Sequence, residues 1–135
     1  GYFGEYIQYS DGIYSYLRAP NKDNSPLFIY SQRWSTAPWW ELPPLDEKTE
    51  AGRWLAWTDN LLFRRSITLE ELNRLHGDLK FVLSGKSMLF NIGEDEAQEH
   101  IIEDKSLEQE YIAKLREALK FWQAPEEHIE RLGLT

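Results

Sequence analysis

Alternating apolar and polar positions mark the start of the chain as β-structure. Two β-prone runs, residues 6–9 and 13–17, flank Asp11-Gly12. Both positions of a tight hairpin turn need positive φ, which Asp and Gly tolerate, so we expect an antiparallel hairpin here. The apolar run from residue 27 to 34 follows Pro26 and predicts a third strand, because a proline at the start of a strand removes no ladder hydrogen bond.

In the next stretch, prolines interrupt the alternation of apolar and polar residues. Three prolines stand within residues 35–45 around Trp39 and Trp40, which excludes a regular helix and predicts a loop carrying large apolar rings. After it, apolar residues at helical spacing behind a possible Asp46 cap favour a helix over residues 46–65. Residues Trp54 to Trp57 could also alternate as a strand, so a strand is the alternative prediction for this stretch.

A clear helix start follows at residue 69. Thr68 and Glu71 have the spacing of a capping box, and Ile67 and Leu72 occupy the two positions of a hydrophobic staple. We therefore predict a helix that begins at Leu69.

The end of that helix is open between two alternatives. Gly77 suits a left-handed cap, after which residues 79–83 and 88–92 would pair as strands across Ser84-Gly85-Lys86. The competing interpretation continues the helix to Gly85. We favour the pair of strands.

The C-terminal region is helical by two signals. Ser106 and Gln109 form a second capping box, and Pro125 suits the first turn of a short final helix. The apolar stripe of the longer helix consists of Leu107, Tyr111, Leu115, Ala118, Leu119 and Trp122. The pattern as a whole predicts an α+β fold, with an N-terminal antiparallel β-hairpin or meander packed against C-terminal helices in a single domain, residues 1–135.

Composition narrows the class of protein. With 135 residues, 41% of them apolar and 28% charged, the chain is long enough to bury a core. The absence of cysteine excludes disulfide scaffolds, thiol nucleophiles and cysteine-ligated zinc. No apolar run reaches the roughly 18 residues of a membrane span. We expect a soluble, cytoplasmic protein, although a cysteine-free chain is compatible with secretion too.

Charge is distributed unevenly. The net charge is −8, from 23 acidic and 15 basic residues, and most of the excess lies in the second half. Between residues 94 and 110 a single base, Lys105, accompanies eight carboxylates: Glu94, Asp95, Glu96, Glu99, Glu103, Asp104, Glu108 and Glu110. Such a field repels phosphate backbones and anionic lipid, so we expect neither nucleic acid nor membrane as a direct partner.

Candidate catalytic and metal-binding patterns are weak. His100 stands four residues from both Glu96 and Asp104, so a helix here would bring the three side chains to one face and suit a metal-dependent enzyme. Gly85-Lys86-Ser87 resembles the end of a phosphate-binding loop, but Lys80 occupies the place of its first glycine. No nucleophile, base and orienting group stand at a recognisable spacing, and we expect no cofactor or metal.

The character of the chain therefore favours a binding protein. In size, acidity and lack of catalytic spacing it resembles the inhibitor or immunity partners of bacterial nuclease toxins, and nucleic-acid mimics, although no motif carries the resemblance. The leading hypothesis is a non-catalytic protein that engages a basic partner through Glu94, Asp95, Glu96, Glu99, Glu103 and Asp104, with Trp39 or Trp40 as an apolar anchor. The alternative is a small-ligand or glycan-binding β-rich module that uses the Trp- and Tyr-rich N-terminal half: Trp34, Trp39, Trp40 and the tyrosine-rich hairpin.

Overall fold

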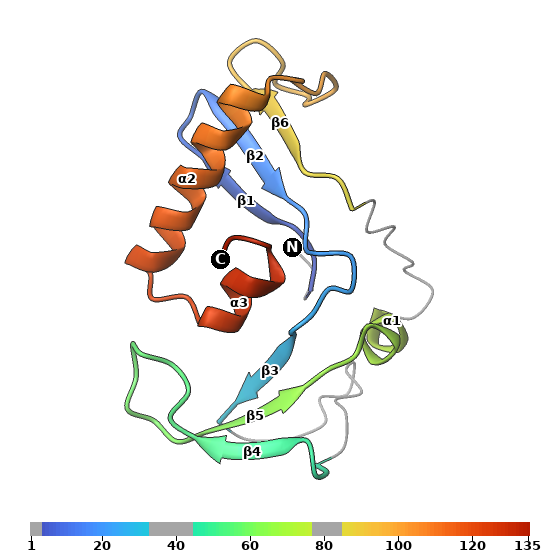
Figure 1. The fold of residues 1–135 in the computed structure, drawn as a ribbon, viewed down its shortest axis with the longest axis vertical. Helices are drawn as coiled ribbons and strands as arrows, with labels where there is room; N and C mark the ends of the chain where they lie inside the picture. Colours follow the sequence, from blue (N-terminus) through green and yellow to red (C-terminus); the bar gives the residue numbers. More distant parts are fainter. Residues whose placement is uncertain (1–3, 33–44, 77–84) are drawn as a thin grey trace.

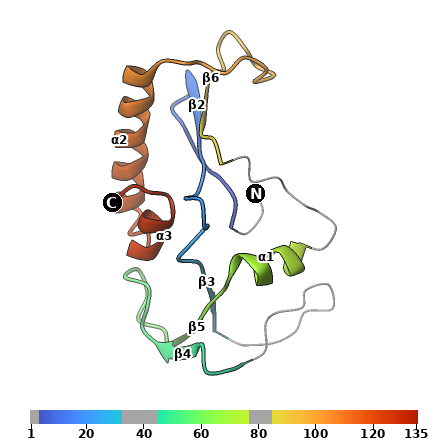
Figure 2. The same ribbon diagram turned by 45° about the vertical axis from the view of Figure 1, so that its right-hand side comes forward.

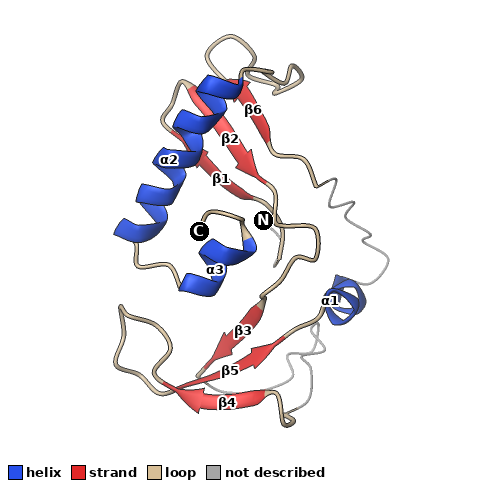
Figure 3. Ribbon diagram, viewed as in Figure 1, coloured by secondary structure: helices blue, strands red, loops and turns tan. Residues whose placement is uncertain are grey.

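The structure is a computed structural model that describes residues 4–32, 45–76 and 85–135. Within these ranges two antiparallel sheets and three helices make up an α+β fold, which confirms the predicted class (Figures 1 and 3). The elements are β1 (Ile7–Ser10), β2 (Tyr14–Arg18), β3 (Phe28–Ser31), β4 (Thr49–Gly52), β5 (Leu62–Ser66), α1 (Leu69–His76), β6 (Met88–Asn91), α2 (Lys105–Phe121) and α3 (Glu126–Arg131).

The first sheet contains the predicted hairpin. β1 and β2 pair in antiparallel register from Ile7↔Arg18 to Ser10↔Ser15. In the turn between them Gly12 has φ +90°, as expected, whereas Asp11 does not have positive φ and its carboxylate accepts hydrogen bonds from the backbone N–H of Ile13 and Tyr14. β6 pairs with the other edge of β2, so the order is β1-β2-β6. Of the expected hairpin or meander the hairpin is present, and the predicted third strand forms as β3 in the second sheet.

The second sheet replaces a predicted helix. β5 pairs with β3 on one side and with β4 on the other, which gives the order β3-β5-β4. The helix expected over residues 46–65 is therefore wrong, because two strands and their connecting loop occupy this stretch. Pairing on both edges satisfies the backbone of β5, a gain that depends on partners distant in sequence.

The main core lies between the first sheet and the C-terminal helices. Figure 2 shows α2 along one face of this sheet, with α3 between the two sheets. The buried cluster consists of Tyr16, Leu89, Tyr111, Leu115, Leu132 and Leu134. Each leucine buried this fully contributes roughly 1.5–3 kcal/mol, so this layer dominates the stabilisation of the fold. Trp122, predicted as part of the apolar stripe, is exposed beyond the end of α2.

The helix starts are partly as predicted. The Thr68–Glu71 capping box is present, and α1 begins at Leu69. α2, however, begins at Lys105, since the Asp104 carboxylate accepts hydrogen bonds from the backbone N–H of Ser106 and Leu107. Asp104 therefore replaces Ser106 as the cap. Both alternatives for the end of α1 fall on residues 77–84, outside the described residues, whereas the strand predicted at residue 88 is confirmed.

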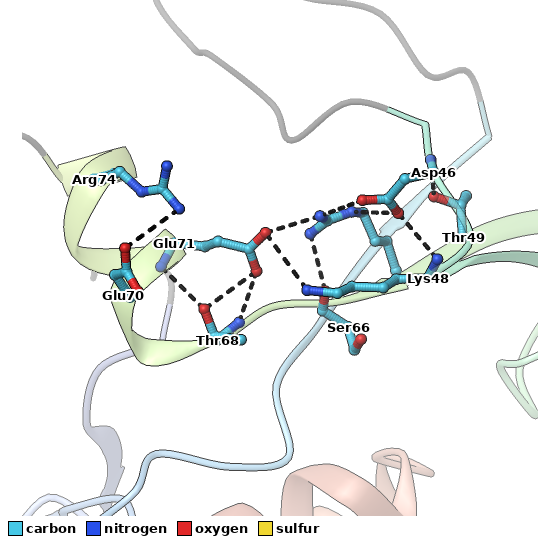
Figure 4. A network of polar contacts seen from close by, with 9 residues as sticks. Asp46, Lys48, Thr49, Ser66, Thr68, Glu70, Glu71 and Arg74 are labelled. Atoms are coloured by element: carbon cyan, nitrogen blue, oxygen red, sulfur yellow. Dashed lines mark hydrogen bonds and ion pairs between the residues drawn. The ribbon is translucent and has the colours of Figure 1, made fainter.

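A buried arginine ties the second sheet to α1. Arg65 on β5 is 2% exposed. Its Nε and Nη2 donate to the two Asp46 carboxylate oxygens at 3.1 and 2.7 Å, and Nη2 also donates to Glu71 at 2.8 Å. Figure 4 shows Asp46 and Glu71 reaching toward the same point from opposite sides. We call Asp46, Arg65 and Glu71 the Arg65 cluster. Its bidentate geometry is the strongest arrangement of an arginine with a carboxylate.

Candidate acidic docking surface

The acidic segment is an irregular loop at one end of the molecule. We call residues 92–104, which connect β6 to α2, the acidic loop, and Figure 1 shows this loop beside the turn between β1 and β2. It contains no helix. The helical face on which Glu96, His100 and Asp104 were expected to meet is therefore absent, and that basis for a metal site is wrong.

Asp95 fixes the conformation of the acidic loop from inside. Its carboxylate accepts hydrogen bonds from the backbone N–H of Glu99 at 3.1 Å and of His100 at 2.7 Å. These hydrogen bonds hold the pKa of Asp95 below its ordinary value, since they stabilise the ionised form. The His100 ring lies beside it, with Nδ1 3.6 Å from the carboxylate. Asp95 thus acts as an internal brace for the loop.

Both ends of the acidic loop are anchored to regular structure. At the start, the Asn91 carbonyl accepts from the backbone N–H of Asp95 at 2.8 Å. At the end, Ile102 donates its N–H to the Leu89 carbonyl at 2.8 Å, and Asp104 caps α2. A loop bonded at both ends and in the middle loses little conformational freedom when a partner binds.

Four carboxylates of the acidic loop remain unpaired. They lie on exposed residues, and none forms a hydrogen bond or ion pair with any residue that the structure describes: Glu94, Glu96, Glu99 and Glu103. Asp95 and Asp104, predicted as part of the same surface, have their carboxylates engaged within the loop and by α2. Farther along, Glu108 accepts from the Tyr16 hydroxyl and Glu110 pairs with Lys114 at 2.9 Å.

Two exposed isoleucines accompany these glutamates. Ile101 is 53% exposed in the loop, and Ile13 is 59% exposed in the hairpin turn. The backbone N–H of Ile92 donates to the Ile13 carbonyl at 2.9 Å, so the turn and the start of the acidic loop are direct neighbours. Sequence reasoning missed these side chains, although an Ile-Ile pair inside an acidic run was a visible signal. The surface therefore combines apolar side chains with unpaired negative charge.

The neighbouring hairpin turn is held to α2 by a polar contact. The Tyr111 hydroxyl donates to the Asp11 carboxylate at 2.5 Å, and Lys114 Nζ lies 3.2 Å from the same carboxylate. The Tyr111 hydrogen bond lowers the pKa of Asp11 well below its usual range, and the Glu110 carboxylate raises the pKa of Lys114. Lys114 is thus neutralised within the chain and does not offset the charge of the acidic loop.

Trp34, Trp39 and Trp40 lie outside the described residues. Within the described ranges no three His, Asp or Glu side chains are grouped so that they hold a metal ion. Among the helices of the same ranges, none is both long and apolar enough to cross a membrane.

Comparisons of the chain with protein-family models, with curated proteins and with solved structures gave no significant match.

Proposed function

We propose that this chain is a non-catalytic binding protein that engages a basic protein partner through the acidic loop, in the manner of an inhibitor or immunity protein. The observation that carries the proposal is a contrast within the loop: two aspartates are used to hold its shape, while four glutamates stay exposed and unpaired. A carboxylate that forms no internal contact retains its full charge for a partner.

The shape of the loop supports recognition as well as attraction. Because its backbone is braced by Asp95 and anchored at Leu89, the glutamates are presented from a preorganised segment. Ile13 and Ile101 provide apolar area that a partner can cover, and a desolvated apolar centre within a charged rim is typical of protein interfaces.

The sign of the surface selects the class of partner. Negative charge without compensating bases speeds association with a cationic protein and disfavours an anionic one. Basic nuclease-type toxins are the partner class that best suits this character. Trp39 and Trp40, predicted as an additional anchor, stay a prediction.

Matched charge reversals test the proposal. The test variant is E96K/E99K/E103K, in the acidic loop, and the control is E117K/E126K/E130K, which makes the same charge change at exposed positions of α2 and α3. The chain and both variants are immobilised, proteins from the source cells are captured and identified, and binding kinetics are measured with the captured protein.

We expect a basic protein that binds the wild-type chain and the control but not the test variant. Its association rate is expected to fall by on the order of tenfold as salt screens the interaction. Equal binding by both variants, or capture of a protein without net positive charge, contradicts the proposal.

A further inference from the structure

A second buried arginine stands beside a pocket in the middle of the molecule. Arg131, on α3, is 2% exposed, as is Arg65. A pocket of about 390 Å³ lies among the start of β1, the residues around β3, and α3, which Figure 1 shows between the two sheets. We call it the α3 pocket. The lining residues used below are Leu27, Phe28, Tyr30, Glu127, His128 and Arg131.

The two buried arginines differ in what neutralises them. Arg65 meets two carboxylates. Arg131 Nη1 donates instead to neutral acceptors, the Gly4 and Glu5 carbonyls and the Asn24 side-chain oxygen, at 3.2, 3.3 and 2.8 Å. No described carboxylate lies within ion-pair distance of Arg131. A buried charge without a counter-charge is costly, so this cation favours an anion beside it.

The Nε–Nη2 edge of Arg131 has unused hydrogen-bond donors. Its Nε is buried with no hydrogen-bond partner among the described residues, and Nη2 makes only a 3.4 Å contact with the Glu5 carbonyl. In Arg65 the same Nε–Nη2 edge receives both oxygens of Asp46. The chain itself thus demonstrates which group fits this edge of a buried arginine.

Two other residues that line the α3 pocket each carry a polar atom that is buried without a partner among the described residues. These atoms are the Tyr30 hydroxyl and Glu127 Oε1. An ionised carboxylate oxygen accepts hydrogen bonds, so Glu127 suits a donor such as an ammonium group. Leu27 and Phe28 supply apolar surface nearby. The pocket therefore combines a buried cation, an unsatisfied acceptor and an apolar wall.

We propose that the α3 pocket binds a small apolar α-amino acid, with the ligand carboxylate on the Nε–Nη2 edge of Arg131, its ammonium group on Glu127, and its side chain against Leu27 and Phe28. The volume is within the range of small-molecule sites. This site is separate from the acidic loop, so its test does not depend on the partner proposed above.

The electrostatics of the α3 pocket agree with this assignment. Burial, together with the charge of Arg131, lowers the pKa of His128 to about 4, so the ring is neutral and does not compete for the ligand carboxylate. Burial also lowers the pKa of Arg131 to about 10, which leaves the guanidinium charged at neutral pH. A carboxylate bound to Arg131 offsets part of its field at His128 and is expected to raise the pKa of that ring.

Three probes separate the groups of the ligand. L-Phenylalanine carries both charges, 3-phenylpropanoate only the carboxylate, and phenethylamine only the ammonium. Calorimetry at neutral pH is expected to show the tightest binding for L-phenylalanine and about tenfold weaker binding for 3-phenylpropanoate. Phenethylamine is expected to bind most weakly, because it lacks the carboxylate that Arg131 would hold. An NMR titration of His128 is expected to show a raised pKa when L-phenylalanine or 3-phenylpropanoate is bound, and no change in pKa with phenethylamine.

Variants connect each group to its residue. E127Q should weaken L-phenylalanine about tenfold and leave 3-phenylpropanoate unchanged, while the matched control E126Q, at an exposed neighbouring position of α3, should change neither. R131K should abolish binding of both. Because Arg131 also holds Gly4 and Asn24, R131K is interpreted only after its circular dichroism matches wild type, and E127Q carries the test otherwise.

Several results overturn the proposal. Phenethylamine binding as tightly as L-phenylalanine excludes Arg131 as the anchor. Equal affinities for L-phenylalanine and 3-phenylpropanoate show that Glu127 does not bind the ammonium group. No heat and no His128 shift with either carboxylate at about 10 mM, a concentration that detects even millimolar affinity, removes the site altogether.

Discussion

Replacing Arg65 by methionine tests whether the Arg65 cluster holds the second sheet to α1. R65M keeps much of the apolar stem but removes the guanidinium, and leaves two carboxylates facing the same space. The side chains of Asp46 and Glu71 are 23% and 17% exposed, so each remains largely desolvated once its partner is gone. The variant therefore loses the attraction between the guanidinium and the two carboxylates, while the carboxylates still bear the cost of desolvation.

The magnitude follows from how such pairs behave. Breaking one side of a buried ion pair costs roughly 3–5 kcal/mol, and the partial exposure of both carboxylates places R65M near the lower end, about 3 kcal/mol. For a chain of this length that corresponds to a melting temperature lower by about 10 °C. The matched control is R74M, because Arg74 pairs with Glu70 on the exposed side of α1 at 3.8 Å. We expect it to cost less than about 0.5 kcal/mol.

The pH dependence separates charge from packing. The Arg65 guanidinium and the Thr68 N–H lower the pKa of Glu71 to about 2, against an ordinary value of 4.5. Because the folded-state pKa is the lower one, this stabilisation is complete above 4.5 and is lost as the pH falls toward 2. The difference in unfolding free energy between wild type and R65M should therefore shrink over that window. Urea unfolding followed by circular dichroism measures it.

Two outcomes refute this reasoning. If R65M is no less stable than R74M near neutral pH, the Arg65 cluster does not hold the sheet. If R65M is destabilised equally at all pH values, the cause is lost packing of the side chain and not lost ion pairing.

Three other substitutions are predicted from single contacts, each measured by thermal or urea unfolding. L115A opens the main core and should cost about 3 kcal/mol, while L61A, at an exposed position, should stay within about 0.5 kcal/mol; equal losses contradict the assigned core. D104A removes the cap of α2 and should cost about 1 kcal/mol, whereas E103A should cost almost nothing. Y111F removes the hydrogen bond that holds the hairpin turn and should cost about 1 kcal/mol; an unchanged stability shows that this contact is dispensable.

Local signals predicted the elements whose conformation is decided locally. Asp11-Gly12 sets the hairpin turn, and Thr68 with Glu71 starts α1, because in each case the interacting groups stand within a few residues of one another. The predicted start of α2 was wrong by two residues, because Asp104 and Ser106 are both residue types that cap helices well. Only the hydrogen bonds of the folded chain show which one is used.

Long-range pairing determined what the sequence pattern did not. Residues 46–65 have helical spacing, yet β5 is held by β3 and β4, and the side chain expected to cap that helix, Asp46, binds Arg65 instead. The α3 pocket had no sequence signal at all, since its lining comes from three segments that are far apart in the chain. The acidic loop was found from composition, but composition did not distinguish bracing carboxylates from free ones.

That distinction makes stability and partner binding separable. Arg65, Asp95 and Asp104 have their charges satisfied inside the fold, so changing them alters the free energy difference between folded and unfolded chain. The carboxylates of the exposed glutamates form no hydrogen bond or ion pair with the described residues, so reversing their charge alters mainly the electrostatic field that an approaching protein meets. E96K/E99K/E103K should therefore lower the association rate at nearly constant melting temperature. R65M should lower the melting temperature at a nearly constant association rate. If the charge-reversal variant has a melting temperature as low as that of R65M, these glutamates stabilise the fold and are not free to bind a partner.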